Sequence, residues 1–219
     1  MSPMAIDVFV EVVCPWCWIG ERRLAQALKL WHARHPLAIE PTVRFLPFEL
    51  NPDLPTAGVD RRAYLESKFG PGAGAEMYTR VLEAGRELSV DFDFAAIRRQ
   101  PNTRAAHLLL QGAIDQPPLQ HALLQAFMRA FFTQGADLGD HDTLVSLAAQ
   151  AGLPELAARA WLADPELLAR TTAIEMQART LGIGGVPFFI LDRRLGVSGA
   201  QPPEELLAAI ERASAPEEC

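Results

Sequence analysis

The sequence predicts an α/β protein with a four-stranded mixed sheet, in which a β-α-β unit and a final β-β-α unit are separated by a large all-helical insertion. Two observations predict this fold. Apolar runs flank a helical pattern within residues 1–50, and two further apolar runs precede a helix within residues 183–219. Residues 51–182 show helical stripes and no convincing strand. We therefore expect one domain formed by 1–50 and 183–219, and an inserted helical domain formed by 51–182.

The first unit has the simplest pattern. Ile6–Val13 is apolar at almost every position, as is typical of a strand that is covered on both faces. Pro15–His35 then follows a helical pattern that ends at the next proline. Ile39–Leu46 is the second expected strand, and its pairing should begin near Thr42 because the preceding proline cannot donate to a ladder.

The last helix of the insertion has the clearest ends. Asp164 is the expected N-cap, Pro165 takes the first helical position, and Gly182 lies just beyond the C-terminus. Residues at four-residue spacing indicate helix packing in the insertion: Leu119, Leu123, Phe127 and Phe131. Two strands and a closing helix are expected after the insertion: Val186–Leu191, Leu195–Ser198 and Pro203–Ala213.

Composition excludes several classes of protein. The 219 residues are 49% hydrophobic, which is ample for a compact core, and carry a net charge of -7. An acidic chain is not expected to bind nucleic acid, which attracts clustered Lys and Arg. No apolar stretch is long enough to span a membrane, and residues 1–13 contain no Lys or Arg, so we expect no secretory signal and a cytoplasmic location. The sequence leaves the oligomeric state open, and a homodimer is one candidate.

Cys14 and Cys17 are the candidate catalytic residues. They enclose Pro15 and Trp16, and the motif lies between a buried strand and the first turn of a helix. Unpaired amide groups and the helix dipole stabilise a thiolate at that position. Cys17 lies one turn further on the same face, so the two sulfurs can close a disulfide. We expect Cys14 to exchange with a substrate disulfide and Cys17 to resolve the mixed disulfide.

Other interpretations of the pair are weaker. Two ordinary buried cysteines would fit a lone Cys-x-x-Cys motif, but the strand-helix context favours redox chemistry. A zinc site needs about four ligands, whereas the chain has only Cys219 and five scattered histidines besides the motif, so we expect no metal. Cys219 is the last residue of an acidic tail, and its thiol is interpreted as incidental.

A second signal lies far along the sequence. Gly184 and Gly185 precede Val186 and Pro187 at the start of the third strand. A proline at the start of a strand that follows flexible glycines suits a cis peptide bond, although most prolines in such places are trans. The presence of Cys14 and Cys17 in the same chain is what favours a cis bond at Pro187.

Together these residues resemble the DsbA family of thioredoxin-fold proteins, and most of all its cytoplasmic FrnE-type branch. The resemblance covers nearly the whole chain. Its matching segments are Val12-Val13-Cys14-Pro15-Trp16-Cys17-Trp18-Ile19-Gly20, Pro47-Phe48-Glu49-Leu50-Asn51-Pro52, Asn102-Thr103 with Ala106-His107, Gly185-Val186-Pro187-Phe188-Phe189 and Ser198-Gly199-Ala200-Gln201-Pro202. Only the first and fourth of these are specific to redox function.

The resemblance implies a thioredoxin fold with an inserted helical domain. It also implies that Pro187 is cis and lies against the cysteines, and that the Val186 backbone pairs with a bound peptide or glutathione. Pro15 and Trp16 complete the expected substrate-binding residues. We expect no tightly bound cofactor, with glutathione as a candidate co-substrate.

The chain also departs from the family pattern. Trp16 stands where DsbA carries His, and it supplies no positive charge, so we expect Cys14 to be less acidic than in strong oxidases. Glu11 could accept a proton from Cys17, although we favour a solvated carboxylate at the strand end. Trp18 and His107 are interpreted as packed helix residues rather than site residues.

The leading functional hypothesis is a thiol-disulfide oxidoreductase or isomerase that acts on protein or small-molecule disulfides. The alternative is a glutathione-dependent isomerase or transferase, because 2-hydroxychromene-2-carboxylate isomerases and kappa-class transferases resemble the same fold. Those enzymes generally have Ser at the first motif position, so Cys14 and Cys17 favour redox chemistry. A binding module whose cysteines only sense oxidation is a third class that the sequence leaves open.

Overall fold

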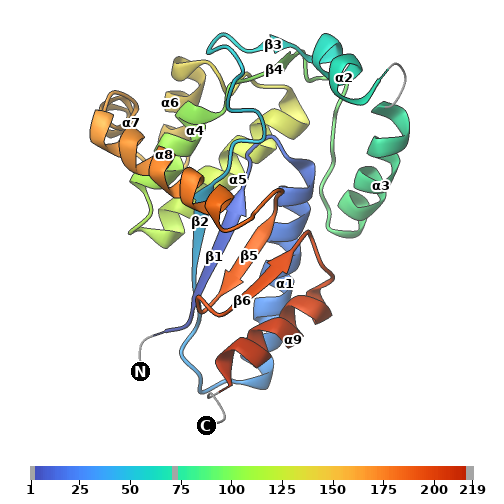
Figure 1. Cartoon of the computed structure of the whole chain (residues 1–219), viewed down its shortest axis with the longest axis vertical. Helices are drawn as coiled ribbons and strands as arrows, with labels where there is room; N and C mark the ends of the chain where they lie inside the picture. The colour runs from blue at the N-terminus through green and yellow to red at the C-terminus, as the bar shows by residue number, and fades with distance from the viewer. Residues whose placement is uncertain (1–2, 71–73, 216–219) are drawn as a thin grey trace.

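A computed structural model describes residues 3–70 and 74–215. Its main sheet has four strands in the order β2-β1-β5-β6. β1 runs parallel to β2 and antiparallel to β5, and β5 pairs antiparallel with β6. The mixed four-stranded sheet predicted from the sequence is thus confirmed (Figure 1). The strand bounds are Ala5–Val10 for β1, Thr42–Pro47 for β2, Phe188–Leu191 for β5 and Leu195–Ser198 for β6.

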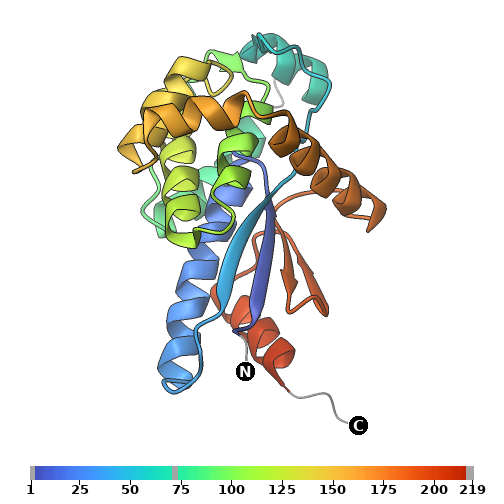
Figure 2. The same ribbon diagram turned by 90° about the vertical axis from the view of Figure 1, so that its left-hand side faces the viewer.

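Helices cover both faces of the sheet. Helices α1 (Pro15–Arg34) and α9 (Pro203–Ser214) pack together on one face, and α8 (Pro165–Thr180) packs on the other. Figure 2 shows α1 and α8 on opposite sides of strands β1 and β2. Alternate residues of β1 contact the two faces: Val8 belongs to the larger core cluster and Phe9 to the cluster under α8. This is why β1 has almost no polar position.

The helical segment lies beyond one end of the sheet (Figure 1). Its core and the core on the α1 face of the sheet form one continuous cluster, which includes Val8, Leu24, Phe127 and Leu144. The helices preceding α8 are α2 (Arg61–Phe69), α3 (Gly74–Glu87), α4 (Arg104–Gly112), α5 (Pro117–Gln134), α6 (His141–Gln150) and α7 (Glu155–Leu162).

Local sequence signals explain the ends of α8. The Asp164 side chain accepts hydrogen bonds from the amides of Glu166 and Leu167, at 2.8 and 3.1 Å. Pro165 takes the first helical position, where no amide hydrogen is needed. Gly182 follows the helix with a φ of 81°, a conformation that suits glycine. All three expectations for this helix are confirmed.

Three expectations about strands are wrong in detail. The strand expected over Val186–Leu191 begins only at Phe188, after the cis bond. The first strand ends at Val10 rather than Val13, because the chain turns at Glu11, whose carbonyl accepts a hydrogen bond from the Cys14 amide. The segment expected to be all-helical contains a two-stranded ladder of β3 (Val59–Asp60) and β4 (Arg99–Gln100). Strands of two residues are too short to show an alternating pattern.

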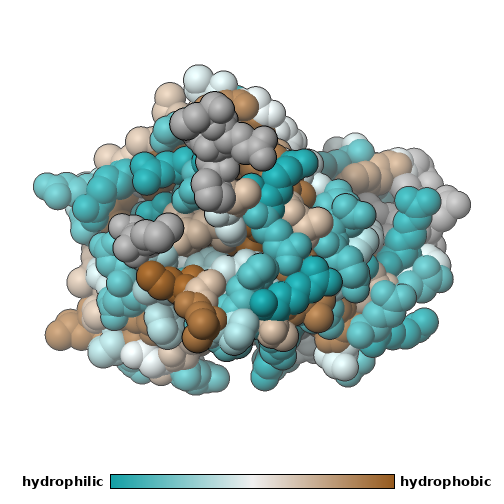
Figure 3. All heavy atoms as spheres, turned by 90° about the horizontal axis from the view of Figure 1, so that it is seen from below, coloured by the Kyte–Doolittle hydropathy of each residue, from teal (hydrophilic) through white to brown (hydrophobic). Residues whose placement is uncertain are grey.

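The surface at the end of the molecule that carries both termini is largely hydrophilic (Figure 3). Leu37 and Ile39, in the loop between α1 and β2, are the exposed apolar residues of that connection. Within the described ranges, no helix combines the length and the apolar character needed to cross a bilayer.

Candidate active site

The two motif cysteines begin helix α1. Cys14 is the N-cap residue, with extended backbone angles and no side-chain capping bond, and Pro15 occupies the first helical position. The Cys17 amide donates to the Cys14 carbonyl at 3.0 Å, which closes the first turn. Both cysteines are free thiols; Cys14 is 7% exposed and Cys17 is fully buried. Cys14 is therefore the more exposed of the two cysteines.

The surroundings of the two sulfurs shift the pKa values of Cys14 and Cys17 in opposite directions. The hydrogen bond from the Cys17 thiol, together with amide hydrogen bonds from Cys17 and Trp16, lowers the pKa of Cys14 although burial opposes the shift. Burial raises the pKa of Cys17 well above its usual value, and the neighbouring Cys14 adds to the increase. Cys14 is thus the more acidic thiol of the pair and Cys17 the less acidic one.

The loop before β5 lies against Cys14. The Val186-Pro187 peptide bond is cis, and the Cys14 thiol donates to the Val186 carbonyl at an Sγ–O distance of 3.8 Å. Gly20 permits this arrangement, because a Cβ at that position would lie 2.7 Å from Pro187 Cγ. The absence of a side chain at Gly20 lets α1 approach the proline loop closely.

The two tryptophans of the motif have different surroundings. Trp18 is 3% exposed, stacks on Phe132 at 5.8 Å between ring centroids and donates from Nε1 to Gln125 at 3.3 Å. Its interpretation as a core residue is confirmed. Trp16 is half-buried and packs against the core.

Glu11 corrects one expectation. It is 1% exposed, so its interpretation as a solvated strand-end carboxylate is wrong. Oε1 lies 3.2 Å from His107 Nε2, and Oε2 accepts from the Leu50 amide at 3.0 Å and from Thr103 Oγ1 at 3.1 Å. Its own amide donates to Cys17 Sγ at 3.4 Å. Three donors compensate for the burial of this charge.

A model of the DSBA-like thioredoxin domain matches residues 5–211 of this sequence. The chain belongs to the DSBA-like thioredoxin domain family. The expected thioredoxin fold and the disulfide oxidoreductase or isomerase class are thus confirmed at the level of the family.

Known proteins agree with this membership. The crystal structure of SCO1869 from Streptomyces coelicolor, a probable DsbA oxidoreductase, is 31% identical with a TM-score of 0.84, and the match covers 99% of this chain and 93% of that one. Cytosolic disulfide reductase DsbM from Pseudomonas aeruginosa, solved with GSH, has 20% identity and a TM-score of 0.64, with 95% and 98% of the two chains covered. A 2-hydroxychromene-2-carboxylate isomerase has 16% identity and a TM-score of 0.69, with 95% of both chains covered. These last two similarities show the fold alone.

Among curated proteins, YwbO of Bacillus subtilis is 26% identical over 148 residues. That match covers 68% of this chain and 66% of YwbO, so it spans just under two thirds of the relative's length.

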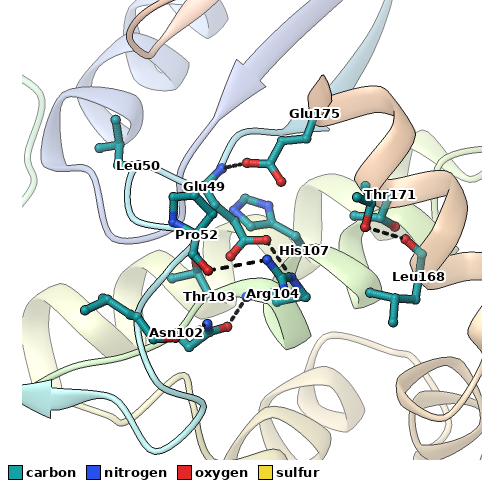
Figure 4. A network of polar contacts seen from close by, with 12 residues as sticks. Glu49, Leu50, Pro52, Asn102, Thr103, Arg104, His107, Leu168, Thr171 and Glu175 are labelled. Carbon is teal, nitrogen blue, oxygen red and sulfur yellow. Dashed lines mark hydrogen bonds and ion pairs between the residues drawn. The ribbon is translucent and has the colours of Figure 1, made fainter. Parts of the chain in front are cut away.

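In this DSBA-like chain, a buried polar network lies next to Glu11. Glu49 accepts from Arg104 Nε at 2.9 Å, its amide donates to the Glu175 carboxylate, and Arg179 Nη2 donates to its carbonyl at 2.6 Å. Figure 4 shows Glu49, Arg104, His107 and Glu175 converging from a loop and two helices. Burial raises the pKa of Glu49, against the lowering effect of His107 and Arg104. Among these groups, only His107 has a role predicted from the sequence, as a packed helix residue.

The structure brings the expected site residues together. Cys14, Cys17, Pro15 and Trp16 form the first turn of α1, and the cis bond at Pro187 places Val186 beside Cys14. Across the described parts of the chain, no three His, Cys, Asp or Glu side chains lie close enough to hold a metal ion. A hollow of about 430 Å³ lies elsewhere, between α1, β2 and α5, and neither motif cysteine lines it.

Proposed function

We propose that this chain is a cytoplasmic thiol-disulfide oxidoreductase of the FrnE type, which exchanges the Cys14-Cys17 pair with protein or small-molecule disulfides. The observation that supports it is the asymmetry of the pair: the more accessible sulfur lies at the start of α1 with a lowered pKa, and the buried one has a raised pKa. A nucleophile and a resolving thiol require this difference.

The exchange balances as two substitutions at sulfur. The Cys14 thiolate attacks one sulfur of the substrate disulfide, and the other leaves as a thiolate that takes up a proton. Cys17 then loses its proton and attacks Cys14 Sγ, which releases the second substrate thiol and leaves a Cys14-Cys17 disulfide. The same steps run in reverse when the pair begins oxidised.

Pro15, Trp16, Val186 and Pro187 are the proposed substrate contacts. Trp16 is a half-buried aromatic residue in the same first turn of α1, and the Val186 carbonyl accepts a hydrogen bond from Cys14. An extended peptide or glutathione bound there could pair with this backbone, as strands added to a sheet edge do. DsbM, which has the same fold, was solved with GSH, and this supports glutathione as a co-substrate.

An insulin-reduction assay with dithiothreitol tests the proposal. The wild-type protein should accelerate insulin precipitation, Cys14→Ser should abolish the effect, and Cys219→Ser should leave it unchanged. If the wild type and Cys14→Ser are equally inert, the proposal is wrong. Glutathione-dependent turnover that survives Cys17→Ser would instead support the alternative, an isomerase or transferase, for which the shared fold with 2-hydroxychromene-2-carboxylate isomerase is the motivating observation.

A further inference from the structure

The segment that contains Asn102, Thr103 and His107 has no part in the exchange described above, yet it contacts the cysteine turn. Thr103 is the N-cap residue of α4 but makes no capping bond to its own helix; its hydroxyl donates to Glu11 at 3.1 Å. His107, one turn later, lies 3.2 Å from the other Glu11 oxygen. Both side chains of this pair are 1% exposed, and the pair is ionic when the imidazole is protonated. A charge pair this deeply buried is costly unless its partners are well placed.

Glu11 in turn contacts both cysteines through its backbone. Its amide donates to Cys17 Sγ at 3.4 Å, and its carbonyl accepts from the Cys14 amide at 3.0 Å. The negative charge of its side chain raises the pKa of both thiols. Any group that changes the charge or the position of Glu11 therefore acts on the redox pair.

We infer that Thr103 and His107, from the inserted helices, are positioning residues that act through Glu11 to ease the resolving step at Cys17. The inference rests on the proposed function. An imidazolium at His107 offsets the Glu11 carboxylate, and the Thr103 hydroxyl holds that carboxylate in place. Without them, the carboxylate opposes formation of the Cys17 thiolate more strongly, because low dielectric surroundings enlarge the interaction between charges.

The charged groups around His107 favour its protonated form. Burial disfavours the imidazolium, but the hydrogen bond to Glu11 and the negative charges nearby outweigh it and raise the pKa of His107. Within the described structure, His107 Nδ1 is buried without a hydrogen-bond partner. The charged groups that face this region are Glu11 after β1, Glu49 after β2, Arg104 on α4, and Glu175 and Arg179 on α8.

During the resolving step, the Cys17 thiol releases its proton and its sulfur bonds to Cys14 Sγ. The bond from Cys14 to the substrate sulfur breaks, and the departing thiolate takes up a proton. Glu11 and His107 keep their protonation states and exchange no electrons. Their effect is on the free energy of the Cys17 thiolate that forms in this step.

The aromatic disulfide DTNB separates the two steps in a Cys219→Ser background. Attack by Cys14 releases the first coloured thiolate, and resolution by Cys17 releases the second, so stopped-flow absorbance follows both phases at each pH. His107→Gln should slow the second phase about tenfold and shift its pH profile to higher pH, because the unopposed Glu11 carboxylate disfavours the Cys17 thiolate. Glu11→Gln combined with His107→Gln should restore the second phase to within about threefold of wild type, because the opposing charge is also gone.

Three results would overturn the inference. One is a second phase in His107→Gln with the wild-type rate and pH profile. Another is a slowed phase that the double variant does not restore, since this indicates a packing role only. If His107→Gln does not fold, Thr103→Val must slow the second phase while Thr103→Ser does not, and equal rates in these two variants would overturn it. A wild type that releases only one thiolate would instead contradict the proposed function itself.

Discussion

At the scale of single residues, the acidity of Cys14 depends on the hydrogen bonds that its sulfur accepts. The Cys17 thiol is the largest cause of its lowered pKa, and amides of the first turn of α1 add to it. Trp16 contributes an amide but no charged side chain. The motif therefore stabilises a thiolate by hydrogen bonding at a helix N-terminus rather than by a neighbouring cation.

Removing the Cys17 thiol should make Cys14 less acidic. In a Cys219→Ser background, Cys17→Ala should raise the apparent pKa of Cys14, because the hydrogen bond that lowers it most is lost. Cys17→Ser keeps a hydroxyl donor and should raise it less. Iodoacetamide alkylation rates across pH measure these values. An apparent pKa of Cys14 below about 5 in the wild type would contradict the prediction that Cys14, which has no cationic neighbour at Trp16, is less acidic than in strong oxidases.

Gly20 is a second residue whose effect is local. In Gly20→Ala the new Cβ would lie 2.7 Å from Pro187 Cγ, so the cis-proline loop must move. We expect a loss of about 1–3 kcal/mol in the free energy of unfolding, and a reduced rate of insulin reduction because Val186 is displaced from Cys14.

Gly184→Ala is the matched control for this substitution. No atom lies within 4 Å of a Cβ at Gly184, and its φ is not positive. Urea unfolding and the insulin assay should both give wild-type values for it. Equal behaviour of the two alanine variants would show that the close approach of α1 to Pro187 has no consequence.

At the scale of elements, one side chain joins the helical segment to the sheet. Gln120 of α5 is fully buried, accepts from the Phe45 amide at 2.9 Å and donates to the Phe45 and Leu110 carbonyls at 2.9 and 3.0 Å. It thus pairs with the backbone of edge strand β2 as a neighbouring strand would, and it covers an edge that would otherwise be open.

Gln120→Leu should therefore be strongly destabilising. It leaves a buried amide and carbonyl of Phe45 without partners, and each unsatisfied group costs about 1–3 kcal/mol, so we expect a loss of about 2–6 kcal/mol. Urea unfolding followed by circular dichroism measures it. Gln150→Leu, on the exposed end of α6, is the control and should change stability by less than about 0.5 kcal/mol. Similar losses in both variants would exclude the edge-pairing role.

The sequence predicted those elements whose signals are local. Asp164, Pro165 and Gly182 mark α8 within a few residues of its ends, and Cys14 with Pro15 marks the start of α1. Glu11 was misinterpreted because its partners are 39, 92 and 96 residues away in sequence, and nothing near it indicates burial. The role of Gln120 was not predicted for the same reason, since its contacts depend on how α5 packs against β2.

At the scale of the whole molecule, the site lies where the sheet and the helical segment meet. The cysteines and the cis-proline loop come from the ends of the chain, whereas Thr103 and His107 come from its middle. A continuous core joins the two parts. The division into domains 1–50 with 183–219 and 51–182 stays a prediction, and the shared core suggests that the two parts unfold together.

This junction should also make stability depend on pH. Because the folded state raises the pKa of His107 above the unfolded value of about 6.5, folding favours its protonated form. The resulting stabilisation is fully present below about pH 6.5 and is lost as pH rises through the folded-state pKa. Burial also raises the pKa of Glu49, so folding favours its protonated form. The stabilisation from Glu49 is therefore also lost as the pH rises, in its case from about pH 4.3.

The free energy of unfolding in urea should therefore fall as the pH is raised from about 6 through the folded-state pKa of His107. His107→Gln removes the titrating group and should flatten that part of the curve, although the variant is less stable at low pH. His141→Gln, at an exposed position on α6, should keep the wild-type slope. A slope in His107→Gln equal to that of wild type would mean that the buried imidazole is neutral throughout, and that Glu11 is stabilised by its Leu50 and Thr103 donors alone.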